Sequence, residues 1–354
     1  MRHARNNKFL ATSRAPENSL LLGTHSWLVH NDSRKCSKDE RNWYWTKLTL
    51  HACGAEHFAC GNAFCIPMEK RCNAIEDCID GSDEQDCGKL IKRSSYNKGI
   101  TPVRENDQDL LVNFSLKIHD IEIFEDNEDF ETKISFNRTW FDGRLTYKHL
   151  KRNSGMNLNT LLPSESEAIW FPYIVYNNVR EDGDIMGTEV IDSNKFDHVE
   201  VIPNDKFSYV ADDNMHIFNG SENALTMKKG YNIKWKCEYV YHWYPFDTQF
   251  CRMEFVSIKP HTELLPTHIR YRPDIHMNCY TLNRIQMCKS VIDEFKAIVV
   301  EVALGRPLVS NLLTVFVPTI LLIIVSFMAR FFADNYVDMV VQVNLTLTLT
   351  LATM

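Results

Sequence analysis

The stretch that decides the fold is residues 237–251, CEYVYHWYPFDTQFC, in which two cysteines bracket thirteen residues. Apolar and polar residues alternate through residues 233–241, which run into this stretch, and again through residues 112–119 and 134–137. Alternation with a period of two is typical of strands that bury one face. Because polar turns separate these short strands, we predict that the chain is mainly β and that residues 108–307 form an extracellular, immunoglobulin-like β-sandwich.

The composition excludes some classes of protein. The chain has 354 residues, of which 44% are apolar and 24% are charged, so it is expected to fold and to hold two or three domains. A net charge of −7 argues against a protein that binds nucleic acid through a basic face, and no nucleic-acid partner is expected. The mean hydropathy of −0.29 indicates that most of the chain faces water, although the average hides one apolar block near the C-terminal end.

The cysteines and sequons indicate an oxidising, extracellular compartment. Eleven cysteines are an odd number, and six of them lie in residues 53–87, a density typical of secreted modules. Cys36, in the unassigned extracellular segment 1–52, has no obvious partner. No apolar signal-peptide core is visible, so we expect the N-terminal end of the protein to be missing from this sequence. Four glycosylation sequons agree with export, at Asn31, Asn113, Asn137 and Asn219.

Residues 53–87, CGAEHFACGNAFCIPMEKRCNAIEDCIDGSDEQDC, combine six cysteines with an acidic cluster. A segment this short cannot build a sufficient core, so it needs disulfides and a metal to fold. It closely resembles the LDL-receptor class A repeat, with Phe58 between the first two cysteines and the closing DCIDGSDE. Residues 88–107 contain Gly, Pro, Ser and mixed charges without a period, and are expected to form a linker.

The resemblance to this repeat implies three disulfides and a calcium site. The implied disulfides pair Cys53 with Cys65, Cys60 with Cys78, and Cys72 with Cys87. Calcium prefers hard oxygen ligands. The implied ligands of Ca²⁺ are the side chains of Asn73, Asp77, Asp83 and Glu84 and the backbone carbonyls of Lys70 and Ile75. Asn73 stands where the family usually has Asp, which lowers the charge of the site. The alternative is an acidic surface of solvated carboxylates without a metal.

The apolar block predicts membrane helices. Between Asn311 and Arg330 there is no charge, so residues 308–332 are predicted to form a first transmembrane helix, with Pro318 in mid-span. The alternative is a buried core helix. Residues 337–354 alternate Leu and Thr in part, which favours a strand by period, but an isolated strand would leave backbone groups unpaired in lipid. We therefore predict a partial second, pore-lining helix that has Asn344, Thr348 and Leu351 on one face.

Four motifs then point to one family. The Tyr-Pro-Phe-Asp core of residues 237–251 follows WFDGRL (140–145) and IWFPYIVYNN (169–178) and precedes LGRPL (304–308). This order resembles the Cys-loop, or pentameric ligand-gated, ion channels over residues 108–354. The module upstream and the closing stretch are similar to an invertebrate orphan branch near the proton- or zinc-responsive chloride channels. On this resemblance the chain ends inside the second helix, so we expect a fragment that conducts nothing alone.

The resemblance implies a role for several residues and partners. Cys237 and Cys251 would form a disulfide, and Asp247 with Arg306 would couple the sandwich to the first helix in gating. The alternative is that Asp247 and Arg306 only stabilise the fold. The implied partners are four further channel subunits in a pentamer, a small extracellular ligand and membrane lipid. The implied location is the plasma membrane, with several spans and an extracellular N-terminal part.

The binding pocket departs from the pattern of the family. The implied ligand-binding positions are Tyr176, Tyr280, Ser135, Asn137 and Ile258. Ile258 stands where many members have an aromatic residue, Tyr173 replaces a usual Asp, and a glycan on Asn137 would obstruct this face, so a quaternary amine is not favoured as ligand. Cys279 and Cys288 flank NRIQM and would pair across the capping hairpin that carries Tyr280. Tyr176 and Tyr280 can equally be ordinary aromatic residues of the sandwich.

Three functions from different classes are compatible with these patterns. The favoured one is a subunit of an extracellular ligand-gated ion channel, with anion conduction favoured only by the resemblance to the branch. The second is a single-span cell-surface adhesion or uptake receptor that binds partners through the class A module. The third is a membrane-tethered enzyme. No GDSGG-like or HExxH segment and no nucleophile–base pair stands out, so we expect no enzyme activity.

Overall fold

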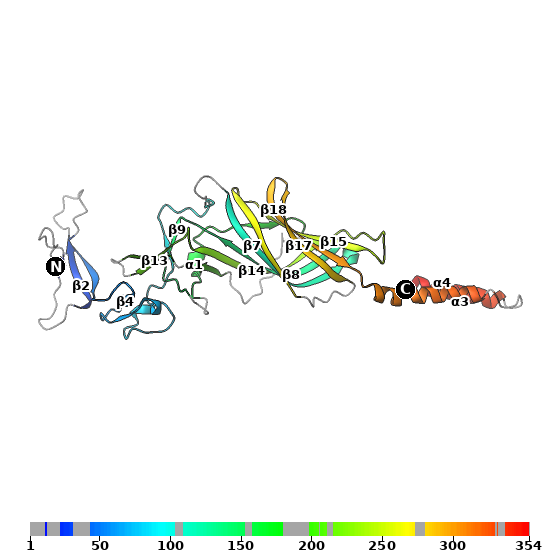
Figure 1. Ribbon diagram of the computed structural model, residues 1–354, viewed down its shortest axis with the longest axis horizontal. Coiled ribbons are helices and arrows are strands. Elements are labelled where there is room, and N and C mark those ends of the chain that lie inside the picture. Colours follow the sequence, from blue (N-terminus) through cyan, green and yellow to red (C-terminus); the bar gives the residue numbers. More distant parts are fainter. Residues whose placement is uncertain are drawn as a thin grey trace. The chain divides into compact units, whose positions relative to one another are not determined.

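The computed structural model describes residues 11–12, 22–30, 43–102, 109–152, 158–179, 198–204, 206–210, 215–272, 280–329, 331 and 337–353 (Figure 1). Three predicted residues, Asn31, Cys36 and Cys279, lie outside these ranges. The chain divides into two compact units. The first consists of Met1–Asp107, Thr139–Phe171 and His198–Met227, and the second of Gln108–Arg138, Pro172–Asp197 and Lys228–Met354. The prediction of a mainly β chain is confirmed.

The second unit contains two sheets. One has the order β14 (Ala224–Lys236), β8 (Asp129–Trp140), β7 (Leu110–Phe124) and β16 (Thr262–Tyr271), and the other has the order β10 (Ile174–Tyr176), β15 (Thr248–Ser257), β18 (Phe295–Gly305) and β17 (Thr281–Ile292). In β7 the apolar residues of the alternating pattern are buried and the polar ones face outward. The rings of Phe114 and Phe136 in the first sheet lie 5.1 and 5.9 Å from that of Phe255 in the second. The two inner faces therefore share one core, which confirms the predicted sandwich.

Strands β17 and β18 form the long hairpin of this unit. They are antiparallel from the pair Ile292–Phe295 to the pair Thr281–Gly305. The turn lies at Asp293 and Glu294, both in the left-handed region with φ of 48° and 70°. The expected hairpin around residues 283–287 is therefore wrong, because these residues run along a single strand. An Asp in the turn is the signal that sequence reasoning missed, since Asp tolerates this conformation better than most residues.

The first unit contains smaller sheets. One has the order β12 (Ser208–Val210), β13 (Met215–Asn219), β9 (Leu145–Lys148) and β6 (Leu90–Lys92), and another has the order β1 (Ala11–Thr12), β2 (Gly23–His30) and β3 (Trp43–Leu50). Strand β11 (Val199–Ile202) pairs with the start of β14, and the short helix α1 spans Pro163–Ser166. The cysteine-rich segment folds into β4 (His57–Ala59), β5 (Cys65–Pro67) and the 3₁₀ helices η1 (Met68–Lys70) and η2 (Ser82–Glu84).

The segment expected to be a linker is part of this unit. Strand β6 pairs antiparallel with β9, from Leu90 opposite Tyr147 to Lys92 opposite Leu145. The hydroxyl of Tyr96 donates to Asp142 at 3.0 Å and accepts from the backbone N–H of Trp170 at 2.8 Å. A three-residue strand is too short to show a period, which is why the sequence pattern indicated a loop.

The C-terminal residues are helical. Helix α2 (Leu308–Asn311) continues into a π-helical segment, η4 (Leu312–Phe316), then into α3 (Val317–Ala329), and α4 spans Val337–Thr353. The change of helix type falls just before Pro318, which lacks the N–H that an α-helix needs at that point. Among the described residues, no helix is both long and apolar enough to cross a membrane.

Candidate functional site

An ion pair joins the last strand of the sandwich to the cysteine-bracketed stretch. Thr248 on β15 lies opposite Gly305 on β18, so the residues next to them, Asp247 and Arg306, are brought together by the register of the sheet. Arg306 Nε donates to both carboxylate oxygens of Asp247, at 2.9 and 3.0 Å. Only 6% of the Arg306 side chain and 3% of the Asp247 side chain are exposed. At so low an exposure each charge stabilises the other, because burying either one without its partner would cost free energy.

Further groups complete the surroundings of Arg306. Its two terminal nitrogens donate to the carboxylate of Glu125 at 3.3 and 3.4 Å, and one of them donates to the hydroxyl of Tyr280 at 2.7 Å. The guanidinium carbon lies 4.6, 4.9 and 5.7 Å from the ring centres of Tyr280, Tyr244 and Tyr241. These rings cover the faces of a planar cation, while the carboxylates hold its edge.

The electrostatics of this cluster follow from burial and partners. Burial alone would lower the pKa of Arg306, but its hydrogen bonds to Glu125 and Asp247 raise that pKa above the ordinary value. Burial raises the pKa of the Tyr280 hydroxyl, which therefore stays protonated. The cluster is thus a fixed cation between two carboxylates. It cannot shuttle protons near neutral pH, but it can hold two segments in register.

The cluster lies where the sandwich meets the helices of the same unit. Arg306 is followed by Pro307 and then by α2, and the ring of Tyr244 stacks on that of Phe316 in η4 with centroids 6.4 Å apart. The strands β15 and β18 are therefore connected to the helical segment in two ways, one covalent and one through packed rings. Sequence reasoning found Asp247 and Arg306 but missed Glu125, whose short helix η3 (Glu125–Asn127) follows β7.

The five predicted ligand-binding residues do not gather in one place. The ring of Tyr176 on β10 contacts Phe136, Tyr231, Trp235 and Phe255, with centroids 5.7 to 6.5 Å away. Tyr280 instead belongs to the Arg306 cluster, at the opposite end of β17 from the hairpin turn. The expectation that Tyr280 lies in the cap of this hairpin is therefore wrong, because the turn begins at Asp293, thirteen residues after Tyr280.

Of the other three predicted positions, two lie on β8 of the first sheet and one follows β15 of the second. Ser135 on β8 is buried and its hydroxyl lies 2.9 Å from the His119 ring nitrogen on β7. Asn137, two residues along the same strand, is half-buried. Ile258 follows β15 and is 41% exposed. Cys288 lies on β17 and forms no disulfide with any described residue.

Four disulfides are present among the described residues. Three lie in the cysteine-rich segment and join Cys53 to Cys65, Cys60 to Cys78, and Cys72 to Cys87. The fourth joins Cys237 to Cys251 and closes the stretch that carries Asp247. These are four of the five pairs that the resemblances implied, and the fifth includes Cys279, which lies outside the described residues.

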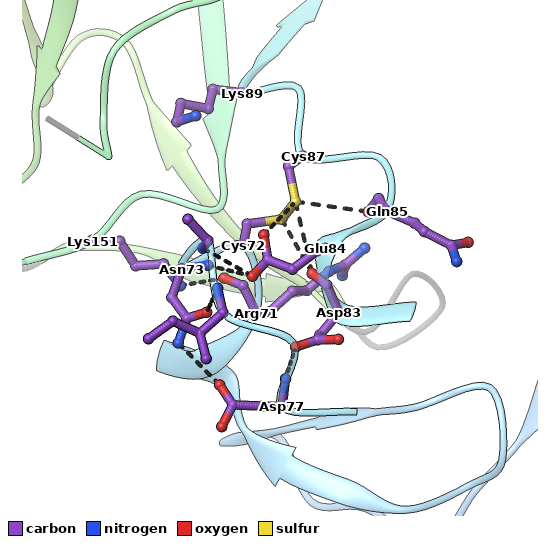
Figure 2. Close-up of a disulfide and its surroundings, with 12 residues drawn as sticks. Arg71, Cys72, Asn73, Asp77, Asp83, Glu84, Gln85, Cys87, Lys89 and Lys151 are labelled. Atoms are coloured by element: carbon purple, nitrogen blue, oxygen red, sulfur yellow. Dashed lines mark hydrogen bonds between the residues drawn. A yellow bond between two sulfur atoms is a disulfide. The ribbon is translucent and has the colours of Figure 1, made fainter. Parts of the chain in front are cut away.

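Hydrogen bonds connect the segment that carries the four predicted side-chain calcium ligands, Asn73, Asp77, Asp83 and Glu84 (Figure 2). Asp77 accepts hydrogen bonds from Lys70 Nζ at 2.5 Å and from Asn73 Nδ2 at 3.0 Å, and the first of these lowers its pKa. Glu84 Oε1 accepts from the backbone N–H of Asn73 at 2.7 Å. Asp83 Oδ2 accepts from the backbone N–H of Asp77 at 2.7 Å. The carboxylates therefore converge on the turn that carries Asn73.

One atom of this group tests whether a cation fits. The Asp83 side chain is fully buried, yet its Oδ1 has no hydrogen-bond partner among the described residues. A buried carboxylate oxygen without a donor is costly, and a cation beside it removes that cost. Three carboxylates with an amide oxygen are also the hard donor set that Ca²⁺ prefers. The residues present therefore fit a calcium ion.

The predicted pore-lining residues lie on α4. Asn344 Oδ1 accepts a hydrogen bond from the hydroxyl of Ser326 on α3, so this side chain joins the two helices. The hydroxyl of Thr348 donates to the backbone carbonyl of Asn344 at 2.8 Å. Leu351 lies one turn further along the same helix. A polar contact between helices and a polar lining of a pore are both compatible with these positions.

Comparison with known proteins assigns both parts of the chain. Residues 84–299 match the family described as the neurotransmitter-gated ion-channel ligand binding domain, and residues 51–87 match the low-density lipoprotein receptor domain class A. Over 166 residues, 46% of this chain, it is 27% identical to the acetylcholine receptor subunit alpha-type unc-63 of Caenorhabditis elegans, of which the match covers 27%. Over 47 residues, 13% of this chain, it is 40% identical to SCO-spondin of Gallus gallus, of which the match covers 1%.

Proposed function

The chain belongs to the neurotransmitter-gated ion-channel family and carries a low-density lipoprotein receptor class A module, and we propose that it serves as one subunit of a channel opened by an extracellular small molecule. The family is one of ligand-gated channels and not a class of enzymes. We further propose that the subunit works in a pentamer at the plasma membrane, with the sandwich outside the cell and contact with lipid at the helices.

The observation that carries this proposal is the buried cluster around Arg306. The guanidinium of Arg306, two residues before α2 begins, holds Asp247 and Glu125 and so ties the strands of the sandwich to the start of the helical segment. Because the pair is buried and Arg306 Nε bonds both carboxylate oxygens of Asp247, the pair is stiff, and a shift of the strands displaces the helix start with it. We propose that this cluster passes ligand binding on to the pore.

The nature of the ligand and of the ion is a finer part of the proposal. Tyr173 and Ile258 occupy positions where a box of aromatic residues that binds a quaternary amine would need other residues. Tyr176 packs into the aromatic core of the sandwich. Both observations support a ligand other than a quaternary amine. The resemblance to proton- and zinc-responsive chloride channels favours anion conduction. Modules of the class at residues 51–87 typically bind Ca²⁺, and we propose Asn73, Asp77, Asp83 and Glu84 with the Lys70 and Ile75 carbonyls as its ligands here.

Electrical recording tests the proposal. Cells that express the protein, alone and with channel subunits of the same source, are exposed to a panel of amines, amino acids, protons and zinc. We expect a ligand-evoked current in co-expressing cells whose reversal potential follows the chloride gradient. Arg306→Lys cannot bond Asp247, Glu125 and Tyr280 at once as the guanidinium does, so we expect the response to fall by about 5- to 150-fold, the range of coupling between distant sites.

The matched control is Arg252→Lys, on the same sheet, where the arginine side chain is 60% exposed and faces Glu301. It should leave the current unchanged, and antibody staining should show both variants at the cell surface in equal amounts. An undiminished current in Arg306→Lys would contradict the coupling role. Ca²⁺-dependent capture of a protein without any current would favour the adhesion receptor instead.

A further inference from the structure

The calcium module and strand β9 of the same unit meet through one lysine. Lys151 Nζ donates to the backbone carbonyl of Glu69 at 2.7 Å and also to that of Arg71. Figure 2 shows Lys151 beside the turn that carries Arg71 and Asn73. These two carbonyls lie at the C-terminal end of η1, where backbone C=O groups lack partners and a cation is favourable.

Lys151 is itself held in place. Asn159, only 3% exposed, accepts a hydrogen bond from the backbone N–H of Lys151 at 2.7 Å and donates to its carbonyl at 2.8 Å. The Asn159 carbonyl in turn accepts from the N–H of Val201 on β11 at 3.1 Å. The lysine therefore projects from a fixed point two residues after His149, just beyond the end of β9.

The turn that Lys151 grips is also the turn that surrounds the calcium site. The Lys70 carbonyl lies between the two carbonyls that Lys151 binds, and Asn73 follows two residues after Arg71. Occupation of the site by Ca²⁺ would hold this segment from one side, and the ammonium holds it from the other. Two cations that bind the same short turn cannot be independent, because ordering the turn for one removes an entropy cost for the other.

Two further contacts make the module part of the unit. The Tyr209 ring on β12 packs against the small core of the module, which contains Phe58, Ile66 and Met68. Where the module leaves for β6, the Glu165 carboxylate accepts from the backbone N–H groups of Lys89 and Leu90 at 2.7 and 2.9 Å. The module is therefore packed and hydrogen-bonded on both sides of the calcium turn.

We propose that calcium binding in the module orders the rest of the first unit, and that the effect is passed to β9 and β6 by the hydrogen bonds of Lys151 to the calcium turn. Extracellular Ca²⁺ then orders the strands that hold Tyr96 against Asp142 and Trp170. The module is rigidly attached to these strands when Ca²⁺ is bound and loosely attached when it is absent. The role does not require the channel activity proposed above, because it concerns only the order of the first unit.

Hydrogen exchange read by mass spectrometry tests this on the full chain in detergent, with calcium chloride or with EGTA. In the wild type, calcium should slow exchange in peptides of residues 53–87 and also in those of β9 and β6, the latter by about 5-fold or more. Lys151→Met keeps an unbranched side chain that is one atom shorter and has no donors. This variant should still bind Ca²⁺ by calorimetry, while the slowing stops at the module.

Three variants complete the experiment. Asp83→Asn should abolish calcium binding and all calcium-dependent protection, and Lys206→Met, which removes an exposed lysine of the same unit, should behave as the wild type. Lys151→Arg keeps two donors, should restore protection of β9 in part, and serves if Lys151→Met fails to fold. The proposal is overturned if calcium protects only the module in the wild type, or if protection of β9 survives Lys151→Met. Neither result depends on a current.

Discussion

The calcium module and the sandwich of the second unit are stabilised in different ways. The module holds three of the four disulfides, and its buried cluster is small, with two of its five residues being cysteines. The sandwich holds one disulfide among the described residues and instead buries a continuous set of large aromatic rings. Short segments bury too little apolar surface to fold by that means alone, so covalent and metal cross-links substitute for a core.

This difference predicts which kind of substitution should destabilise each region. Truncating an apolar side chain should damage the sandwich most, because each ring there has several partners. Removing a cross-link or the metal should damage the module most. The predictions below test this division, beginning with the largest expected effect.

Phe255→Ala should destabilise the sandwich most. The ring is fully buried and contacts four other aromatic rings, with centroids 5.1 to 5.9 Å away. Large-to-small changes of this kind cost about 3–5 kcal/mol of unfolding free energy. Phe250→Ala, on the same strand but 51% exposed, is the control and should cost far less. Urea unfolding followed by tryptophan fluorescence measures both, and equal losses would show that the sandwich does not depend on this core.

The double variant Cys72→Ala, Cys87→Ala should act on the module alone. This disulfide closes a loop of 15 residues, for which chain entropy predicts a loss of about 3 kcal/mol. We expect calcium binding by calorimetry to be lost while the unfolding of the second unit is unchanged. Cys288→Ala, which removes an exposed thiol without a disulfide to any described residue, should change neither measurement. A lower stability of the second unit in the double variant would contradict the claim that cross-links stabilise the module alone.

The stability of the first unit should fall with pH below about 6.5. Burial and then the charge of Arg71 lower the pKa of His149 to about 3, so the unfolded chain binds a proton that the folded unit refuses between these values. The free energy of unfolding should therefore fall by about 1.4 kcal/mol per pH unit, or about 2 kcal/mol at pH 5. Urea unfolding at pH 7.5 and pH 5 measures this loss.

His149→Asn should remove that pH dependence. His149 has a φ of 59°, a conformation that Asn adopts more readily than most residues, so the substitution should not strain the backbone. His268→Asn, at an exposed position, should leave the pH dependence as it is in the wild type. An undiminished pH dependence in His149→Asn would assign the effect to other groups.

What the sequence could predict depended on the length of each pattern. The alternation in β7 extends over many residues and predicted the observed strand, whereas the observed disulfides were implied by the resemblance to two families. Asp247 and Arg306 were found from the resemblance, and the register of β15 on β18 explains why they meet. Each of these predictions rests on a local residue pattern or on motifs that follow one another in a fixed order. Both can be read directly from a sequence.

Features that depend on tertiary register could not be read in this way. Tyr280 was expected at a ligand site, but the position of the hairpin turn decides which end of β17 it occupies. Glu125 contacts Arg306 although the two are 181 residues apart in the sequence, and no sequence motif predicts such a contact. Strand β6 is too short to show a period, and the grip of Lys151 on the module is a contact with backbone carbonyls, which carry no sequence signal.

The parallel pairing of β7 with β16 has a consequence for synthesis of the protein. Leu110 lies opposite Thr262, so the ribosome completes one edge roughly 150 residues before its neighbour exists. At 5–20 residues per second, that edge waits about 8–30 s with unpaired backbone groups. The cysteine-rich module upstream is complete by then and can oxidise and take up calcium first. The nascent chain therefore carries a folded cysteine-rich module and a β7 edge with unpaired backbone groups. During this interval it most needs chaperones to shield that edge.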